Sequence, residues 1–113
     1  MAGMTQEQAR RALMARQEEL AREDAANADS TDTVELQQDS VGRLSRMDAL
    51  QQQAMAQAQR RRRAQERARI AAALVRIAQD EWGYCLTCGH TIASARLRHD
   101  PSLALCVRCA SSP

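Results

Sequence analysis

The four cysteines of this 113-residue chain lie near its C-terminal end, in two pairs with the same internal spacing. Their pattern is Cys85-x2-Cys88-x17-Cys106-x2-Cys109. Two residues between cysteines allow a tight turn to direct both sulfurs at one ion, and the long loop brings the second pair around to complete a tetrahedron. Because four thiolates fill every coordination position, the pattern predicts one structural Zn²⁺ with no open position for water or substrate.

A redox dithiol is the alternative chemistry for a C-x-x-C pair. That chemistry accompanies a βαβ pattern, which this sequence lacks. No apolar stretch is long enough to span a membrane, and the N-terminus lacks the apolar core of a signal peptide, so we expect a cytoplasmic protein without a membrane partner. Paired cysteines in a reducing compartment favour a metal. His90 and His99 are expected to be exposed loop residues, because four thiolates already complete the ligand set.

The elements that position these cysteines are predicted to be helices. One Trp, one Tyr and no Phe leave little aromatic area for a large core, and the many Ala, Gln, Arg and Glu residues favour helix. Residues 5–25 are expected to form a first helix, in which Thr5 and Gln8 make a capping box. Three apolar residues of this segment lie near one helical face: Ala9, Leu13 and Leu20.

A second, longer helix is expected to follow the polar stretch NADSTDT at 27–33. It begins at Asp32, with Glu35 completing a capping box, or at Ser45, with Asp48 in the same role. We expect it to extend to about residue 80 and to be stopped by Gly83. Its apolar residues follow helical spacing: Leu44, Met47, Leu50, Ala54, Ala58, Ile70, Leu74 and Ile77. Such a helix must bury its apolar stripe, either against residues 5–25 as an antiparallel hairpin or against a second copy of the chain.

The predicted fold class is therefore mainly α. An N-terminal helical, coiled-coil-like hairpin occupies residues 1–80, with a loop near 26–33 and an alternative break at 40–45. A small treble zinc-finger module with four cysteine ligands follows over residues 81–113. Trp82 and Tyr84 flank the first cysteine pair and are expected to pack this module onto the helix.

Further residues inside the cysteine module extend the pattern to Cys85-x2-Cys88-x3-Ile92-x3-Arg96-x4-Pro101-x4-Cys106-x2-Cys109, with GYC at 83–85. This pattern resembles the zinc-finger signature of the DksA/TraR family of transcription regulators. Leu86 stands where the family usually has a small or acidic residue. Members of that family place a helical hairpin before the finger, bind bacterial RNA polymerase directly and insert the hairpin into its secondary channel to modulate initiation. The resemblance implies the same non-enzymatic role here, without a need for direct DNA binding.

The resemblance also implies an acidic hairpin tip, for which the sequence offers two registers. The only D-x-x-D motif is formed by Asp29 and Asp32, between the two predicted helices. A gapless count back from Cys85 instead places the tip near Asp48 and Ala49. The aspartates of both registers are kept as candidate polymerase contacts; helix capping or solvation is the alternative role for each of them.

The same gapless count assigns basic positions on the second helix. Arg62 and Arg69 fall where alarmone-responsive relatives have basic residues, whereas Gln65 and Asp100 stand where those relatives are basic. The two arginines are candidate polymerase contacts, and the resemblance adds guanosine tetraphosphate as a candidate small-molecule partner.

Charge is divided unevenly along the chain, and this supports an alternative function. Residues 1–50 carry six Arg and ten acidic residues, whereas residues 51–113 carry ten Arg and four acidic residues. The run Arg60–Arg63 could contact phosphate in a zinc-dependent nucleic-acid-binding protein. The scarcity of aromatic residues disfavours a single-strand binder. The sequence has no phosphate-binding glycine loop or nucleophile elbow, so we do not expect an enzyme.

Overall fold

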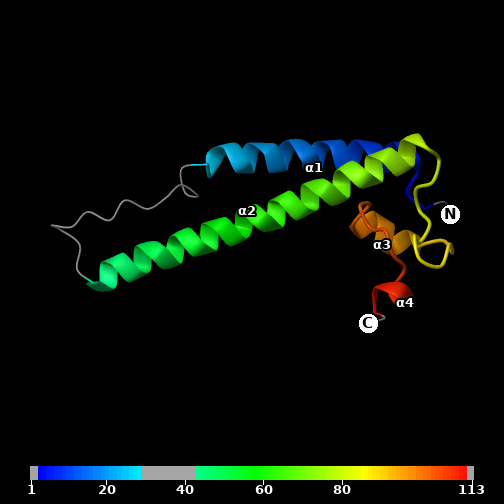
Figure 1. Cartoon of the computed structure of the whole chain (residues 1–113). Coiled ribbons are helices and arrows are strands. Elements are labelled where there is room, and N and C mark those ends of the chain that lie inside the picture. The colour runs from blue at the N-terminus through cyan, green and yellow to red at the C-terminus, as the bar shows by residue number, and fades with distance from the viewer. Residues whose placement is uncertain (1–2, 29–42, 112–113) are drawn as a thin grey trace. The chain divides into compact units, whose positions relative to one another are not determined.

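The computed structural model describes residues 3–28 and 43–111. Its helices, in chain order, are α1 (Gln6–Ala26), α2 (Arg43–Ala78), α3 (Ser94–His99) and α4 (Val107–Ala110) (Figure 1). Strand pairing among the described residues is limited to one isolated antiparallel bridge between Tyr84 and Thr91. The predicted mainly-α fold, with a helical hairpin ahead of a four-cysteine module, is thus confirmed. No helix in the described ranges is long and apolar enough to cross a membrane.

Helix α1 begins at the predicted capping box. The amide of Gln8 donates to Thr5 Oγ1 at 3.1 Å, and the amide of Thr5 donates to Gln8 Oε1 at 2.9 Å. Two amides at the start of the helix are thereby satisfied by side chains. The three apolar residues predicted to share one face of α1 are all buried: Ala9, Leu13 and Leu20.

The chain forms two compact units, and each contains part of both long helices. One unit comprises Met1–Glu18 and Arg67–Pro113, and the other comprises Glu19–Glu66. In the first unit, Ala9 of α1 belongs to the same hydrophobic cluster as Trp82, and Ile77 packs against that cluster. In the second unit, Arg63 Nε donates to Asp24 Oδ1 at 2.5 Å. The start of α1 thus lies near the end of α2 in one unit, and the end of α1 pairs with the middle of α2 in the other, as an antiparallel hairpin requires.

The apolar stripe predicted along α2 is buried only in its C-terminal part. Ile70 is buried and Leu74 and Ile77 are partly buried, whereas Met47 and Leu50 are about half exposed. The reason is length, because a 21-residue helix extends roughly 31 Å and a 36-residue helix roughly 54 Å. Helix α1 can therefore cover only part of α2.

The boundaries predicted between the helices fall mostly outside the described residues. The capping box of Asp32 and Glu35 lies there, as does the D-x-x-D motif. Helix α2 is already helical at Arg43, so Ser45 is not its first residue. The division between residues 80 and 81 remains a prediction. The compact unit that contains the cysteines also includes both neighbouring helix ends.

Helix α2 ends before the glycine that was expected to stop it. Asp80, not Gly83, is the first residue with positive φ, at 57°. The amide of Glu81 donates to the carbonyl of Arg76 at 2.8 Å, and the amide of Asp80 donates to that of Ile77 at 3.1 Å. These two bonds form a Schellman cap, which favours glycine at the position that Asp80 occupies.

Asp80→Gly is expected to stabilise the protein against urea by about 0.5–1 kcal/mol, because glycine adopts positive φ without the steric cost of a Cβ atom. The substitution also removes a negative charge from the C-terminal end of a helix, where it is unfavourable. Asp80→Ala is the matched control, since it removes the charge but retains the Cβ atom. Equal free energies of unfolding for the Gly and Ala variants would contradict the assigned cap.

Candidate metal centre

The first cysteine pair lies in a tight turn held by backbone hydrogen bonds. The amide of Cys85 donates to the carbonyl of His90 at 2.8 Å, and the amide of Gly89 donates to the carbonyl of Cys85 at 2.9 Å. Gly89 follows the second cysteine with φ of 78°, a conformation that residues with a Cβ atom rarely adopt. The turn therefore depends on glycine at this position to direct both sulfurs to the same side.

The second pair lies at the start of the short helix α4. Cys106 is its N-cap residue, and the amide of Cys109 donates to Cys106 Sγ at 3.5 Å. The two cysteine turns are joined directly, because the amide of Leu86 donates to the carbonyl of Ala104 at 2.9 Å. The backbone thus holds the two halves of the cysteine group in register.

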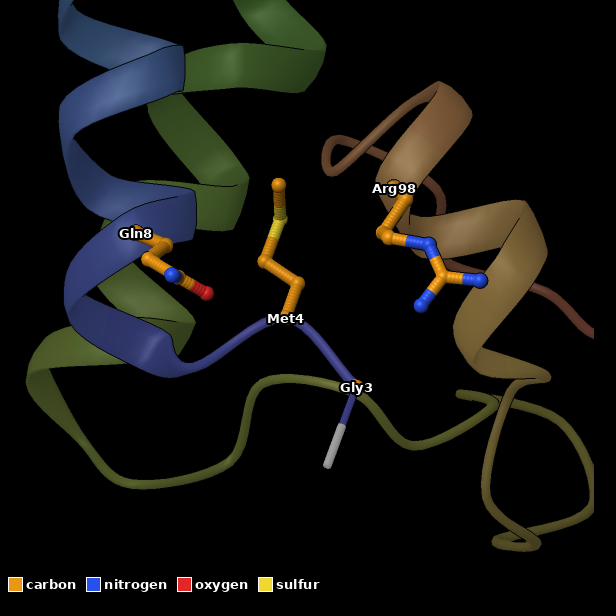
Figure 2. Close-up of a pocket in the computed structure, with 4 residues that line it drawn as sticks. All are labelled: Gly3, Met4, Gln8 and Arg98. Atoms are coloured by element: carbon orange, nitrogen blue, oxygen red, sulfur yellow. The ribbon is translucent and has the colours of Figure 1, made fainter. Parts of the chain in front are cut away.

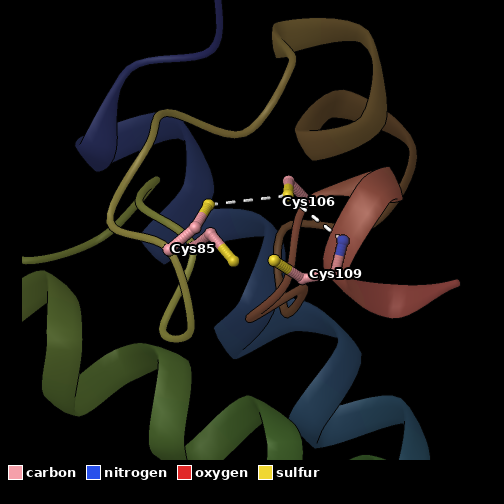
Figure 3. A group of neighbouring side chains, drawn as sticks. Cys85, Cys106 and Cys109 are labelled. Carbon is pink, nitrogen blue, oxygen red and sulfur yellow. Dashed lines mark hydrogen bonds between the residues drawn. The ribbon is translucent and has the colours of Figure 1, made fainter. Parts of the chain in front are cut away.

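The four sulfurs converge. All four Sγ atoms lie within 4.8 Å of one another, and those of Cys88 and Cys106 are 3.8 Å apart. Figure 3 shows the side chains of Cys85, Cys106 and Cys109 turned toward a common centre. Sulfurs placed tetrahedrally about 2.3 Å from a zinc ion are about 3.8 Å apart, so the arrangement fits a tetrathiolate site.

Hydrogen bonds shift the pKa values of three of the cysteine thiols in different directions. The amide of Cys88 donates to the sulfur of Cys85 and lowers the pKa of that thiol to about 6. The amide of Cys109 likewise lowers the pKa of Cys106. In contrast, the thiol of Cys109 donates to the sulfur of Cys85, which raises the pKa of Cys109 to about 12. Thiolates this close repel one another, and a divalent cation at their centre removes the need to retain a proton.

A small hydrophobic core supports the cysteine group. Cys85 is 2% exposed and belongs to a cluster that Trp82 joins at 7% exposure. The other buried members of this cluster are Ala9, Ile92 and Leu97. Trp82 packs the module as predicted. Tyr84 does not share this role, because its side chain is 49% exposed. The backbone of Tyr84 pairs with that of Thr91.

The candidate polymerase contacts do not form one site in the described residues. Asp48, Arg62 and Arg69 are exposed on α2, and Asp29 and Asp32 lie outside the described ranges. A spacing of seven residues places Arg62 and Arg69 on the same side of the helix. His90 and His99 are exposed, as expected.

The arginine run on α2 is not uniformly available to a partner. Arg63 pairs with Asp24, and its side chain is only 13% exposed. Arg60, Arg61 and Arg62 are exposed. The sequence analysis treated all four arginines as one possible phosphate contact, because their order along the chain does not show which of them faces α1. The structure shows that Arg63 does.

A shallow hollow of about 470 Å³ lies between the start of α1 and α3. Figure 2 shows the residues that line it, namely Gly3, Met4, Gln8 and Arg98. The side-chain amide of Gln8 is already engaged in the cap of α1. The lining therefore offers one cation and one thioether, and it contains no pair of groups for acid–base chemistry.

The sequence analysis did not predict that two arginines contact the loop before Cys106. Arg76 is buried in the last turn of α2, and Arg96 of α3 donates to the carbonyl of Leu105 at 3.1 Å. A lone arginine within the apolar run IAAALVRIA was the available signal for Arg76. Arg96 belongs to the quoted signature, but its contact with the loop could not be read from spacing.

Comparison with solved structures supports the fold. The chain is similar to the structure of transcription factor DksA2 from Pseudomonas aeruginosa, with a TM-score of 0.75 and 23% sequence identity. The similarity covers 93% of this chain and 79% of the other. No protein-family model and no curated protein matches this sequence. The fold of this chain and its own four-cysteine group fit a zinc-finger protein of the DksA/TraR type.

Proposed function

We propose that this chain is a non-enzymatic bacterial transcription regulator of the DksA/TraR family. It binds RNA polymerase and inserts its helical hairpin into the secondary channel to modulate initiation. The observation that carries the proposal is a four-sulfur group packed against the base of a long helical hairpin, in a chain whose fold is similar to that of a solved transcription factor. The zinc-finger signature in the sequence supports the same assignment independently of the fold.

In this proposal the four cysteines hold one structural zinc ion. Their sulfurs have the separation that a tetrahedral thiolate site requires, and all four coordination positions are filled by the protein. Zinc would supply folding free energy to a module with a small core, rather than reactivity toward a substrate.

The polymerase-facing residues would lie on and beyond α2. Asp48, Arg62 and Arg69 are exposed there, so a partner can reach them without rearrangement of the hairpin. Asp29 and Asp32 complete the set of candidates. Guanosine tetraphosphate is proposed as a small-molecule partner, with Arg62 and Arg69 as its candidate contacts.

A nucleic-acid-binding role is the second candidate, because α2 carries nine arginines and only two acidic residues. Three exposed arginines, Arg60 to Arg62, could neutralise phosphate. The pairing of Arg63 with Asp24 reduces the charge available for this purpose. The role requires binding to bare duplex DNA or RNA that falls steeply with salt, and the absence of a complex at low salt in a filter-binding series would exclude it.

A binding competition tests the main proposal. The chain, labelled at its N-terminus, is titrated with core RNA polymerase, and a second factor that occupies the secondary channel is then added. We expect saturable binding that the competitor abolishes. A variant carrying Arg62→Glu and Arg69→Glu should bind more weakly, whereas Arg22→Glu on the exposed surface of α1 serves as the matched control. No binding, or a complex that tolerates the competitor, would contradict the proposal.

A further inference from the structure

Arg76 is the only charged side chain that is buried among the residues that the structure describes, at 9% exposure. Its guanidinium donates to the carbonyl of Leu103 at 3.5 Å, and within these ranges it has no carboxylate partner. Burial lowers the pKa of Arg76. A cation in such a position is costly unless negative charge or hydrogen-bond acceptors compensate for it.

The Leu103 carbonyl belongs to the loop that leads into the second cysteine pair, and this loop is held from several sides. Trp82 Nε1 donates to the carbonyl of Pro101 at 2.9 Å, and Arg96 donates to that of Leu105 at 3.1 Å. Leu105 immediately precedes Cys106. The contact of Arg76 joins this loop to the last turn of α2.

Leu103 lies three residues before Cys106, so a charged cysteine group would supply negative charge on the side of the loop that Arg76 contacts. Four thiolates around one divalent ion retain two net negative charges, and Coulombic attraction across a partly buried region is stronger than in water. Arg96 adds a second cation, and its Nε atom is buried with no hydrogen-bond partner among the described residues. Two arginine side chains thus donate to backbone carbonyls of the loop that precedes Cys106.

We propose that Arg76 is a positioning residue for the metal centre. Its guanidinium fixes the Leu103 carbonyl and offsets the negative charge of the tetrathiolate, so that metal retention depends on the last turn of α2. This inference rests on the proposed structural zinc ion. It adds a residue of the hairpin to the residues that determine how tightly the four cysteines hold a metal.

The test measures release of zinc from the full-length, reduced protein to an excess of a chromogenic chelator. Groups that orient metal ligands typically change metal affinity by about 10- to 100-fold, so Arg76→Met is expected to accelerate release within that range. Arg76→Lys should give an intermediate rate, because it retains the charge but not the planar fork of donors. Arg61→Met, at an exposed position of the same helix, should release zinc at the wild-type rate.

The Met and Lys variants separate a charge-dependent role from simple packing. Packing alone predicts that the apolar Met side chain retains zinc as well as Lys or better, and that result would overturn the proposal. If Arg76→Met fails to fold, the unmodified protein provides the test through the NMR signal of the Arg76 Hη2 protons, which donate to the Leu103 carbonyl. Their exchange with water should be slow with zinc bound and faster after chelation; equal rates would overturn the proposal.

The outcomes distinguish failure of this inference from failure of the proposed function. If the wild-type protein retains zinc and Arg76→Met releases it at the same rate, only the role of Arg76 is overturned. If the wild-type protein binds no zinc, both the metal site and the role of Arg76 are overturned.

Discussion

Removal of the metal from the reduced protein is expected to unfold the C-terminal module while most of the helical content of α2 remains. The module has little apolar area of its own, since its core cluster has five buried members and one of them, Ala9, comes from α1. Structural zinc typically contributes on the order of 10–16 kcal/mol of binding free energy, which exceeds what so small a core can replace. The cysteine thiols would then lose their common partner, and the two turns that carry them would separate.

The single tryptophan provides the measurement. Trp82 is buried at 7% exposure within this core, so its fluorescence should shift to longer wavelength when a chelator is added. Far-UV circular dichroism reports the helices separately. Addition of zinc should restore the original spectrum, and Cys85→Ser should give the shifted spectrum with or without zinc. Unchanged emission and an unchanged melting temperature after chelation would contradict this expectation.

Trp82→Ala is expected to destabilise the unit that contains the cysteines by about 3–5 kcal/mol, the usual cost of truncating a buried large aromatic side chain. The substitution removes the largest side chain of the core cluster. It also removes the indole donor to the Pro101 carbonyl, a bond of 2.9 Å that holds the loop before Cys106. Both losses act on the same loop, so metal retention should fall together with stability.

Urea unfolding followed by circular dichroism measures this effect. Tyr84→Ala is the matched control, because Tyr84 is 49% exposed and surface substitutions usually change stability by less than about 0.5 kcal/mol. Trp82→Phe should cost less than Trp82→Ala, since it retains much of the apolar area and loses the indole donor, a bond whose net contribution is about 1 kcal/mol. Similar losses for Trp82→Ala and Tyr84→Ala would show that the assigned core is wrong.

The features that followed from the sequence are those that short-range chemistry determines. The spacing of the cysteines predicted a convergent sulfur group, and all four Sγ atoms lie within 4.8 Å of one another. The capping box of Thr5 and Gln8 depends on residues three positions apart, and both of its hydrogen bonds are present. Such patterns need no knowledge of which segments pack together.

The features that could not be predicted depend on contacts between distant segments. Apolar spacing placed Met47 and Ile70 in one stripe and could not distinguish their burial, because burial depends on where the shorter partner helix ends. The internal pairing of Arg63 with Asp24 could not be read from a run of four arginines. Asp80, and not Gly83, terminates α2. This could not be predicted, because an aspartate gives only a weak signal for positive φ.

Whether the four cysteines hold one zinc ion is tested most directly by the mass of the intact, reduced protein under native conditions, after purification without added chelator. We expect one zinc ion per chain, with protons lost from the cysteine thiols. We also expect zinc to be absent from a variant in which Cys106 and Cys109 are both replaced by serine. A wild-type protein that is folded and fully reduced yet carries no zinc, and takes up none when zinc is supplied, would contradict it.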